Sequence, residues 1–515
     1  MNETIVKHLN FGEDAKNKIF QGIETLTKAV SSTLGASGKC VIMENQNGDP
    51  QITKDGVTVA NSIILLDPVE NMGAKLIKEA ARKTVKEAGD GTTTATVLAC
   101  AILKEASKFK ELNPRELKIG INKAVEKVIK HLEKNSAKVK KSNIEQVATI
   151  SANNDQELGK IIYNAFISVG KDGLVIMETH DEPNTKVETI EGVQYEQGFS
   201  NPHFVTNKAK NESELNDCFV LIVDSPIENI RKIQNILEHI IKNQLQLLII
   251  ADVEPQVSSA LAMNKIKGNI KVNIIAAPTY GANRKSTLDD LGLLTGAKVI
   301  SEDLGDDLDL IDIKYLGKCK KVVSNTVETI IQIDSRSEEV IELTKDLEDQ
   351  YNKTTKGFIK DSLEKRISRL KAKVAVVKVG ANSEIELKEK RDRVEDAICA
   401  TRAALKEGIV PGGGIALLNA SSDIEANSKS EEVLLKAIKH PYETILSNAG
   451  VENYKTPTVN GTGLNVVTGE TVNMVKSGII DPLLVTKSAL RNAASVATTI
   501  LSTDCVINNL RAWEQ

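Results

Sequence analysis

The hydrophobic pattern of this 515-residue chain changes period twice, and this change constrains the fold more than any other feature. Up to about residue 135, apolar residues recur at the spacing of long amphipathic helices, most clearly over 116–132. Helical spacing returns from about Glu338 and continues to the C-terminus, apart from one short predicted strand over 374–378. The two ends of the chain are therefore predicted to be helical.

A strand-rich insertion separates these helical parts and begins near Gly173. Short apolar runs at 174–177, 219–223 and 247–250 predict strands, and a helix is predicted over 227–241. This βαβ order favours a sheet that contains parallel strands. Because the chain is too long for a single hydrophobic core, we predict an α+β multidomain fold in which both chain ends build one helical domain.

Composition argues against several classes of function. The net charge is only −4, so nothing indicates a nucleic-acid partner. The six cysteines include no Cys-x-x-Cys pair and the six histidines form no His-Glu-x-x-His pattern, so no zinc site is predicted. No apolar run could cross a bilayer, and Met1 is not followed by the pattern of a secretory signal. We expect a cytoplasmic protein without a membrane partner.

The run 87–96, Glu-Ala-Gly-Asp-Gly-Thr-Thr-Thr-Ala-Thr, joins two helical patterns and is a candidate phosphate-binding loop. Gly89 is a typical helix stop, and a new helix would begin within Thr92–Thr94. A helix N-terminus offers unpaired N–H groups and the positive end of its dipole, and Asp90 is a suitable oxygen ligand for magnesium. The alternative is a plain turn with a threonine cap that binds no ligand.

A second candidate loop is Thr33-Leu-Gly35-Ala-Ser-Gly38-Lys39, between a predicted helix and a predicted strand over 40–43. It is not a Walker loop, because its glycines are too closely spaced and no serine or threonine follows the lysine. From the residues alone, a plain helix-to-strand turn is the favoured interpretation.

These loops belong to a longer series of motifs that resembles one family. The chain is similar to GroEL-type (group I) chaperonin subunits from about Phe11 to about Asp504. Besides 33–35 and 89–94, the motifs that carry the resemblance are Ile52-Thr-Lys-Asp-Gly56, Glu70-Asn-Met-Gly-Ala74, Ile150-Ser-Ala-Asn153, Lys378-Val-Gly380, Arg393-Val-Glu-Asp396, Gly412-Gly-Gly414 and Asp481-Pro482.

The resemblance implies a chaperonin fold with three domains. It places a helical equatorial domain in 1–135 and 409–515, a small α/β intermediate domain in 136–190 and 373–408, and an apical α/β domain, which would bind clients, in 191–372.

The resemblance also implies a function. The chain would be an ATPase that binds non-native polypeptides and promotes their folding inside the cavity of a homo-oligomeric ring, with seven subunits expected. The implied cofactors are ATP, Mg²⁺ and K⁺, and a co-chaperonin is a further candidate partner. Two alternatives stay open: a holdase or scaffold with little ATP cycling, and an ordinary ATPase that acts on a small molecule.

Nucleotide-binding residues follow from the same resemblance. Asp90 would hold Mg²⁺, and Thr33, Lys54 and Thr93 match the positions that hold K⁺. The cofactor-binding residues implied are Thr33, Leu34, Gly35, Ala36, Lys54, Asp90, Gly91, Thr92, Thr93, Thr94, Gly413, Asn465, Val466, Val467 and Asp481.

Two carboxylates are implied as catalytic residues, Asp55 and Asp396. From its spacing alone, Asp396 would be a solvent-exposed acid on a helix. The resemblance instead places it over the γ-phosphate, where it would orient and polarise the attacking water together with Asp55. Phosphoryl transfer depends on positioning and charge neutralisation more than on covalent chemistry, so two carboxylates and magnesium are sufficient.

Client binding is implied for two apical helices and a nearby extended segment. Several of the matching residues are polar, which predicts weaker binding at about 25 cal/mol per Å² of apolar surface lost and therefore specialised clients. The alternative is that Ile233, Ile236 and Leu237 only pack their helix onto its own sheet. The implied client-binding residues are Phe199, His203, Phe204, Gln234, Leu237, Ser258, Ala262 and Met263.

One charge reversal bears on assembly. Family members that stack two rings commonly pair an arginine with a glutamate across the ring contact, in the segment that matches 441–452. Here Glu443 occupies the arginine position, and the acid is retained as Glu452. Two facing carboxylates repel each other, so we predict single or weakly paired rings. The alternative is that Lys436 or Lys439 takes the role of the arginine.

Overall fold

The computed structural model divides the chain into two compact units. It describes residues 7–44, 48–109, 111–170, 173–180, 182–195, 197–208, 210–277, 282–354, 357–371, 373–452, 454, 457 and 459–509. The first unit comprises Met1–Tyr163, Thr179–Thr185 and Val379–Gln515, and the second comprises Asn164–Glu178 and Lys186–Lys378. The predicted helical domain built from both chain ends is thus confirmed, while the finer three-domain division stays a prediction.

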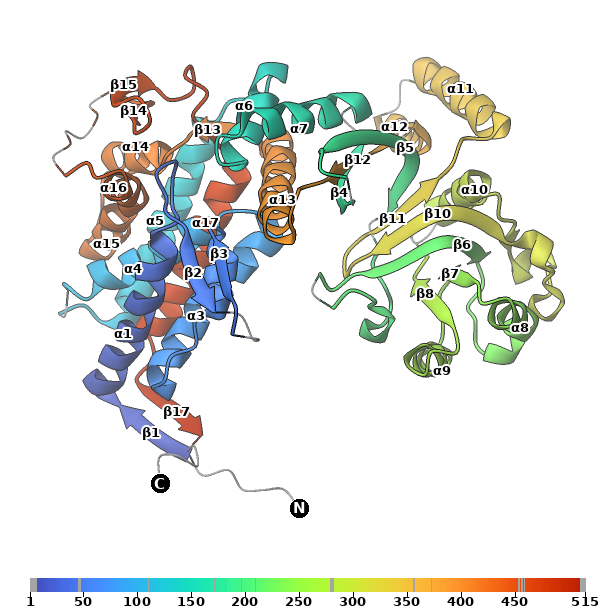
Figure 1. The fold of residues 1–515 in the computed structure, drawn as a ribbon, viewed down its shortest axis with the longest axis horizontal. Coiled ribbons are helices and arrows are strands. Elements are labelled where there is room, and N and C mark those ends of the chain that lie inside the picture. Colours follow the sequence, from blue (N-terminus) through green and yellow to red (C-terminus); the bar gives the residue numbers. More distant parts are fainter. Residues whose placement is uncertain are drawn as a thin grey trace. The chain divides into compact units, whose positions relative to one another are not determined.

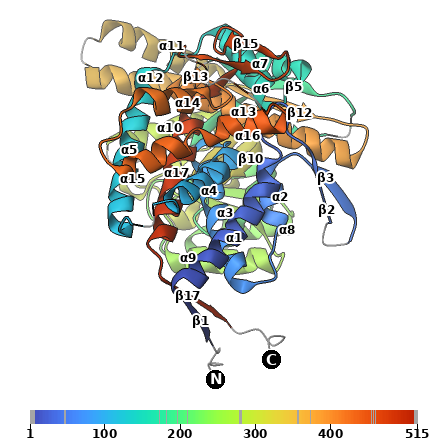
Figure 2. The same cartoon turned by 90° about the vertical axis from the view of Figure 1, so that its left-hand side faces the viewer.

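The first unit is mainly helical (Figure 1). Its N- and C-terminal strands, β1 (Lys7–Phe11) and β17 (Cys505–Asn509), pair antiparallel and lie side by side (Figure 2). The helices of this part of the chain are α1 (Gly12–Ser31), α2 (Gly56–Ser62), α3 (Pro68–Ala88), α4 (Thr92–Ala106), α5 (Pro114–Lys134), α6 (Lys141–Ser151), α7 (Gln156–Val169, which continues into the second unit), α13 (Glu384–Glu407), α14 (Ile415–Asp423), α15 (Lys429–Ala437), α16 (His440–Asn448) and α17 (Leu483–Leu501).

Local sequence accounts for the starts of these helices. Asp67 and Asn113 each accept backbone hydrogen bonds at the N-terminus of α3 and α5, and a proline follows each cap. Buried Leu98 and Ile102 of α4 belong to the core that α1, α3, α5 and α17 also build. The remaining strands of this unit form short antiparallel pairs: β2 (Val41–Glu44) with β3 (Pro50–Thr53), β13 (Ile409–Pro411) with β16 (Ile480–Pro482), and β14 (Thr462–Asn465) with β15 (Glu470–Asn473).

The second unit is built around a nine-stranded mixed sheet in the described residues. The main strand order is β4-β12-β5-β11-β10-β6-β7-β8, and β9 pairs with β6. The pairs β6–β7 and β7–β8 are parallel, as the βαβ order predicts. The strands are β4 (Leu174–Thr179), β5 (Lys186–Tyr195), β6 (Ser213–Val223), β7 (Gln246–Ile250), β8 (Lys271–Ile275), β9 (Val299–Ile300), β10 (Gly317–Ser324), β11 (Thr329–Ile333) and β12 (Lys373–Val379).

Helices cover both faces of this sheet (Figure 1). On β6, Leu221 packs in the core with α8 and α9, whereas its neighbour Ile222 packs in the core with α10, α11 and α12. The strand is therefore apolar on both faces, which explains its continuous hydrophobic run. The helices are α8 (Gln234–Lys242), α9 (Pro255–Ile266), α10 (Ala282–Thr295), α11 (Glu338–Lys353) and α12 (Gly357–Lys371).

The helix predicted over 227–241 begins later than its periodicity suggests. The Ile227 N–H donates to Asp252 O (2.9 Å), and Ile227 forms a parallel bridge with Val253, so the chain is extended there. A 3₁₀ turn, η2 (Ile230–Ile233), then leads into α8. In the described ranges, none of the helices is long and apolar enough to cross a membrane.

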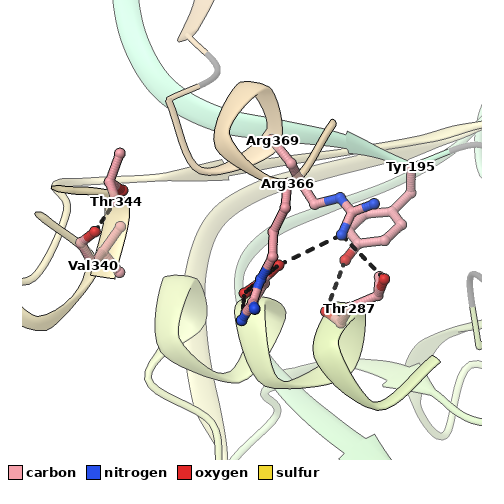
Figure 3. A network of polar contacts seen from close by, with 7 residues as sticks. Tyr195, Thr287, Val340, Thr344, Arg366 and Arg369 are labelled. Carbon is pink, nitrogen blue, oxygen red and sulfur yellow. Dashed lines mark hydrogen bonds and ion pairs between the residues drawn. The ribbon is translucent and has the colours of Figure 1, made fainter. Parts of the chain in front are cut away.

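A buried ion pair joins α10 to α12 (Figure 3). Asp290 has a fully buried side chain and accepts hydrogen bonds from Arg366 at 2.7–2.9 Å, with Arg369 at 3.6 Å. Arg369 also donates to the Thr287 hydroxyl and lies over the ring of Tyr195. Burial raises the pKa of Asp290, although the two arginines act in the opposite direction.

Removing the carboxylate of this pair should destabilise the second unit. Asp290→Ala leaves Arg366 without its partner, so we expect the free energy of unfolding of this unit to fall by about 3 kcal/mol. Urea denaturation followed by circular dichroism measures the loss. Asp289→Ala, a change at the exposed neighbouring acid, is the matched control; an equal loss in both variants would contradict the assigned role of Asp290.

Candidate functional site

The first unit contains a cavity of about 330 Å³ that is lined by every predicted nucleotide-binding and catalytic residue. The loop after α1, the loop before α2, the join between α3 and α4, and one face of α13 all contribute to its wall. These segments are far apart in the sequence, and the tertiary structure brings the residues of the separate motifs together in one cavity. The placement agrees with the predicted site, while the role of each residue stays a prediction.

The join between α3 and α4 forms one wall of the cavity. Gly89 ends α3 with a φ of 74°, and Gly91 precedes α4 with a φ of 93°, a backbone conformation that favours glycine. A Cβ on Gly91 would also lie 2.8 Å from the Val485 side chain. Helix α4 consequently begins at Thr92, as predicted, and its first turn lines the cavity.

Asp55 lies at the start of α2 and is held by the turn it caps. Its carboxylate accepts hydrogen bonds from the Val57 N–H (3.0 Å), the Thr58 N–H (2.8 Å) and the Thr58 hydroxyl (2.6 Å). The next residue, Gly56, packs so closely on α4 that a Cβ there would lie 2.1 Å from the Thr93 hydroxyl oxygen. The carboxylate of Asp55 is thus held close to the first turn of α4.

Asp396 faces the cavity from α13 and is partly buried, so it is not the solvent-exposed acid that its spacing alone indicates. Burial raises the pKa of Asp396 well above its ordinary value, and the negative charges of Asp90 and Asp55 add to the effect. Burial likewise raises the pKa of Asp90, with a further contribution from Asp55. The three carboxylates are therefore close enough to repel one another.

Asp481 in β16 and Asp392 in α13 bring further carboxylates to the same cavity. Burial and the charge of Asp90 raise the pKa of Asp481 to about 7, although the Gly413 N–H donates to it. Asp392 was not predicted as a site residue. It lies one helical turn before Asp396, so the four-residue spacing was a signal that could have found it.

The donor set fits a magnesium–nucleotide complex. The two basic residues among the described lining residues are Lys54 and Arg393, and burial lowers the pKa of Lys54. The cavity thus has more acids than bases and would gain from a bound cation. Among the described residues, no three His, Cys, Asp or Glu side chains form a group that could hold a metal ion by themselves.

The opposite part of the cavity is apolar enough for a nucleotide base. Val466 packs against a cluster that contains Tyr442, Met474 and Leu446, and both Tyr442 and Met474 line the cavity. Tyr442 was not predicted from the sequence. The Asn465 side chain accepts a hydrogen bond from the Val467 N–H (3.0 Å), so it shapes the turn that lines this side.

The predicted potassium ligands also line this cavity. The Thr33 hydroxyl donates to Val30 O at 2.8 Å, which keeps the residue at the end of α1, and Lys54 and Thr93 lie on the neighbouring walls. Nothing further distinguishes a potassium site, and the assignment stays a prediction.

The predicted client-binding residues do not form one exposed surface. His203, Gln234 and Met263 are exposed and Phe199 is half-buried. The other four, Phe204, Leu237, Ser258 and Ala262, are buried at 0–8% exposure. These four side chains are packed inside the second unit, and the client-binding assignment of all eight residues stays a prediction.

The physical reason is the packing of α8 and α9 onto their sheet. Ile233, Ile236 and Leu237 belong to the same core as strands β6 and β7. The packing of this helix on its own sheet, one part of the alternative raised from periodicity, is therefore observed.

Titration of Asp481 gives a test of the crowded carboxylates. A pKa raised to about 7 contributes stability that is present at low pH and is lost as the pH rises through 7. In nucleotide-free protein, Asp481→Asn should therefore stabilise the fold by about 1 kcal/mol more at pH 8 than at pH 6. Thermal unfolding at both pH values measures this, with the exposed Asp14→Asn as control. A pH-independent difference would argue against the cluster.

Comparisons with known proteins identify the family and agree with the fold. A family model described as the TCP-1/cpn60 chaperonin family matches residues 26–511. Two crystal structures of the chaperonin gp146 from the bacteriophage EL 2 (Pseudomonas aeruginosa), both in the presence of ATP-BeFx, are similar in fold. Crystal form II has a TM-score of 0.74 at 24% identity and covers 99% of this chain and 100% of that chain. Crystal form I has a TM-score of 0.65 at 23% identity and covers 98% and 99%. The chain belongs to the TCP-1/cpn60 chaperonin family.

Proposed function

We propose that this chain is the subunit of an ATP-dependent chaperonin that binds non-native polypeptides and promotes their folding inside a ring cavity. The observation that carries the proposal is the meeting of the 89–94 loop, Asp55 and Asp396 in one cavity. The similar phage chaperonin was crystallised in the presence of ATP-BeFx, which supports ATP as the ligand. A holdase or scaffold would need no such set of carboxylates, so the ATP-cycling function is favoured.

Different residues of the cavity would bind the phosphates, hold the magnesium ion and orient the attacking water. The N–H groups at the start of α4 would bind phosphate oxygens, and Asp90 would hold Mg²⁺. When bound, the ion neutralises charge on the phosphates. Asp55 and Asp396 would orient the attacking water. In its ionised form, the Asp396 carboxylate can accept a hydrogen bond from this water, which would fix the orientation of the water toward the phosphate.

Two exposed β-ribbons of the first unit support assembly. In the described residues β1 pairs only with β17 and β2 only with β3, so both ribbons have free edges. Ile42 and Ile52 face each other on the second ribbon and are 70% and 53% exposed. Exposed edges with apolar side chains can pair with another copy of the chain. A homo-oligomeric ring, with seven subunits expected, fits these edges.

The roles of the domains, the potassium site, the location and the co-chaperonin are proposed from the family resemblance. The first unit would contain the equatorial domain and most of the intermediate domain, and the second unit would contain the client-binding apical domain. Potassium at Thr33, Lys54 and Thr93, a cytoplasmic location and a co-chaperonin partner belong to the same proposal.

Two substitutions separate hydrolysis from binding. Asp396→Ala should bind ATP but hydrolyse it about a hundredfold more slowly, because the lost carboxylate acts on the water. Asp90→Ala should lose magnesium-dependent ATP binding itself. Phosphate release and calorimetry measure the two effects, and Glu395→Ala, an exposed neighbour on α13, is the control. Unchanged turnover in Asp396→Ala, or wild-type affinity in Asp90→Ala, would refute the respective assignment.

The ring contact is the second testable part of the proposal. Glu443 on α16 lies 3.8 Å from His440 and accepts a hydrogen bond from the Tyr454 hydroxyl. Among the described residues, Glu443 thus lies beside a histidine and a tyrosine, and neither replaces an arginine facing Glu452. An exposed pair is worth only about 1 kcal/mol or less, but every subunit of a ring would repeat the repulsion.

Reversing this charge should strengthen the contact between rings. Glu443→Arg restores an attractive pair with Glu452 and should shift the population from single to double rings. Mass photometry at low protein concentration measures the distribution, and Glu470→Arg in the exposed strand β15 controls for net charge. If the wild-type protein forms only double rings even at high salt, the prediction of weakly paired rings is wrong.

A further inference from the structure

Large apolar side chains are exposed on a segment that the predicted client site does not include. Leu304, Leu310 and Ile313 are 68%, 75% and 38% exposed. They lie in residues 301–313, called here the acidic segment, which connects β9 to β10 through the short 3₁₀ turns η3 (Glu302–Leu304), η4 (Leu308–Leu310) and the start of η5 (Ile313–Tyr315). Exposed large apolar side chains that recur along one short segment are a candidate for a binding surface.

The segment is anchored, so the exposure of its leucines is built into the fold. Leu308 and Ile311 alternate with the exposed residues and are buried at 1% and 5% in the core that α8 also joins. Asp306 accepts hydrogen bonds from Lys298 (2.7 Å) and from the Ser301 N–H (3.2 Å). Leu304 or Leu310 could enter the core only if Leu308 and Ile311 left it and the hydrogen bonds of Asp306 were broken.

The acidic segment borders the start of α8. The Asn235 side chain donates to Asp309 O (3.3 Å), and Lys232 in η2 pairs with Glu302 (2.8 Å). On α8 the exposed side chains near the start of the helix, Gln234, Asn235 and Glu238, are polar, and Gln234 donates to Glu238 at 2.7 Å, whereas Ile241 near the end is 44% exposed. Next to the start of α8, the exposed leucine is therefore Leu310 of the acidic segment, and this end of the helix offers polar groups.

The charged side chains of the acidic segment are all negative. Residues 301–313 contain six acids and no lysine or arginine. Glu302, Asp306 and Asp312 each pair with one lysine. Asp303, Asp307 and Asp309 have no lysine or arginine within ion-pair distance among the residues that the structure describes. An excess of negative charge thus surrounds the exposed leucines.

We propose that the acidic segment, together with the start of α8, is a docking surface for client segments in which apolar residues alternate with lysine or arginine. The proposal rests on the proposed chaperonin function and specifies its clients. Burial of Leu304 and Leu310 supplies affinity at about 25 cal/mol per Å². The surrounding carboxylates select basic over acidic segments, because charge complementarity gives specificity more than affinity.

Two short fluorescent peptides test this preference. In one, leucine alternates with lysine, and in the other, leucine alternates with glutamate. Fluorescence anisotropy with the full-length wild-type chain should show about tenfold tighter binding of the lysine peptide at low salt. High salt should reduce this preference, because ions screen exposed charges. Equal binding of both peptides at low salt would overturn the proposal.

Variants of the segment separate its apolar and charged parts. Leu304→Ser with Leu310→Ser should weaken binding of the lysine peptide about tenfold or more, because two apolar contacts are lost. Asp303→Lys with Asp309→Lys should reverse the preference between the peptides. The matched control is Val327→Ser with Ile341→Ser, two comparably exposed apolar residues elsewhere in the second unit. All substituted side chains are exposed, and circular dichroism verifies the fold.

The outcomes separate this inference from the proposed function. If the leucine variant binds like the wild type, or the control variant loses binding equally, the docking surface is refuted while client binding elsewhere stands. If the wild type turns over ATP but binds neither peptide, the client-binding part of the proposed function fails as well. If the leucine variant loses its oligomeric state in mass photometry, the segment is a contact between copies of the chain, and the proposal is also overturned.

Discussion

Mutual repulsion among buried carboxylates is the main constraint on the stability of the first unit. Asp90, Asp396 and Asp481 come from three distant parts of the chain, and burial raises the pKa of each. Ionised groups in this arrangement destabilise the unit until a cation enters. The apolar core of α4 and its neighbours must therefore offset this cost. A bound cation would offset this repulsion, so binding in the cavity would raise the free energy of unfolding of the first unit.

Helix α13 links this cavity to the packing of the unit. The Cys399 side chain lies so close to Gly89 that a Cβ on the glycine would be 2.4 Å from the Cβ of the cysteine. One turn earlier, Asp396 faces the same cavity. Because the helix is packed against the 89–94 loop, a movement of α13 would change both the position of this carboxylate and the shape of the phosphate wall.

In the second unit, the constraint is the burial of apolar side chains on both faces of the sheet. Its strands are apolar on both faces, so α8 and α9 must direct Leu237 and Ala262 inward to cover one face of the sheet. The exposed side chains at the start of α8 are then polar, and Ile241 is an exposed apolar residue near its end. The segment between β9 and β10 is held by its own buried residues and can expose leucines without weakening the sheet. Core formation thus decides which elements are available for recognition.

The sequence by itself determined the elements whose causes are local. Glycine with positive φ ends α3 and precedes α4, and β7 lies where its apolar run predicts it. The apolar run 219–223 gives the second half of β6, which begins earlier, at Ser213. The motifs also identified the residues that line the cavity. Only the tertiary structure decided that Asp396 is partly buried beside Asp90, that Asp392 joins them, and that Phe204 is in the core. Periodicity reports which side chains share a face of one helix or strand, whereas burial and charge coupling depend on what packs against that face.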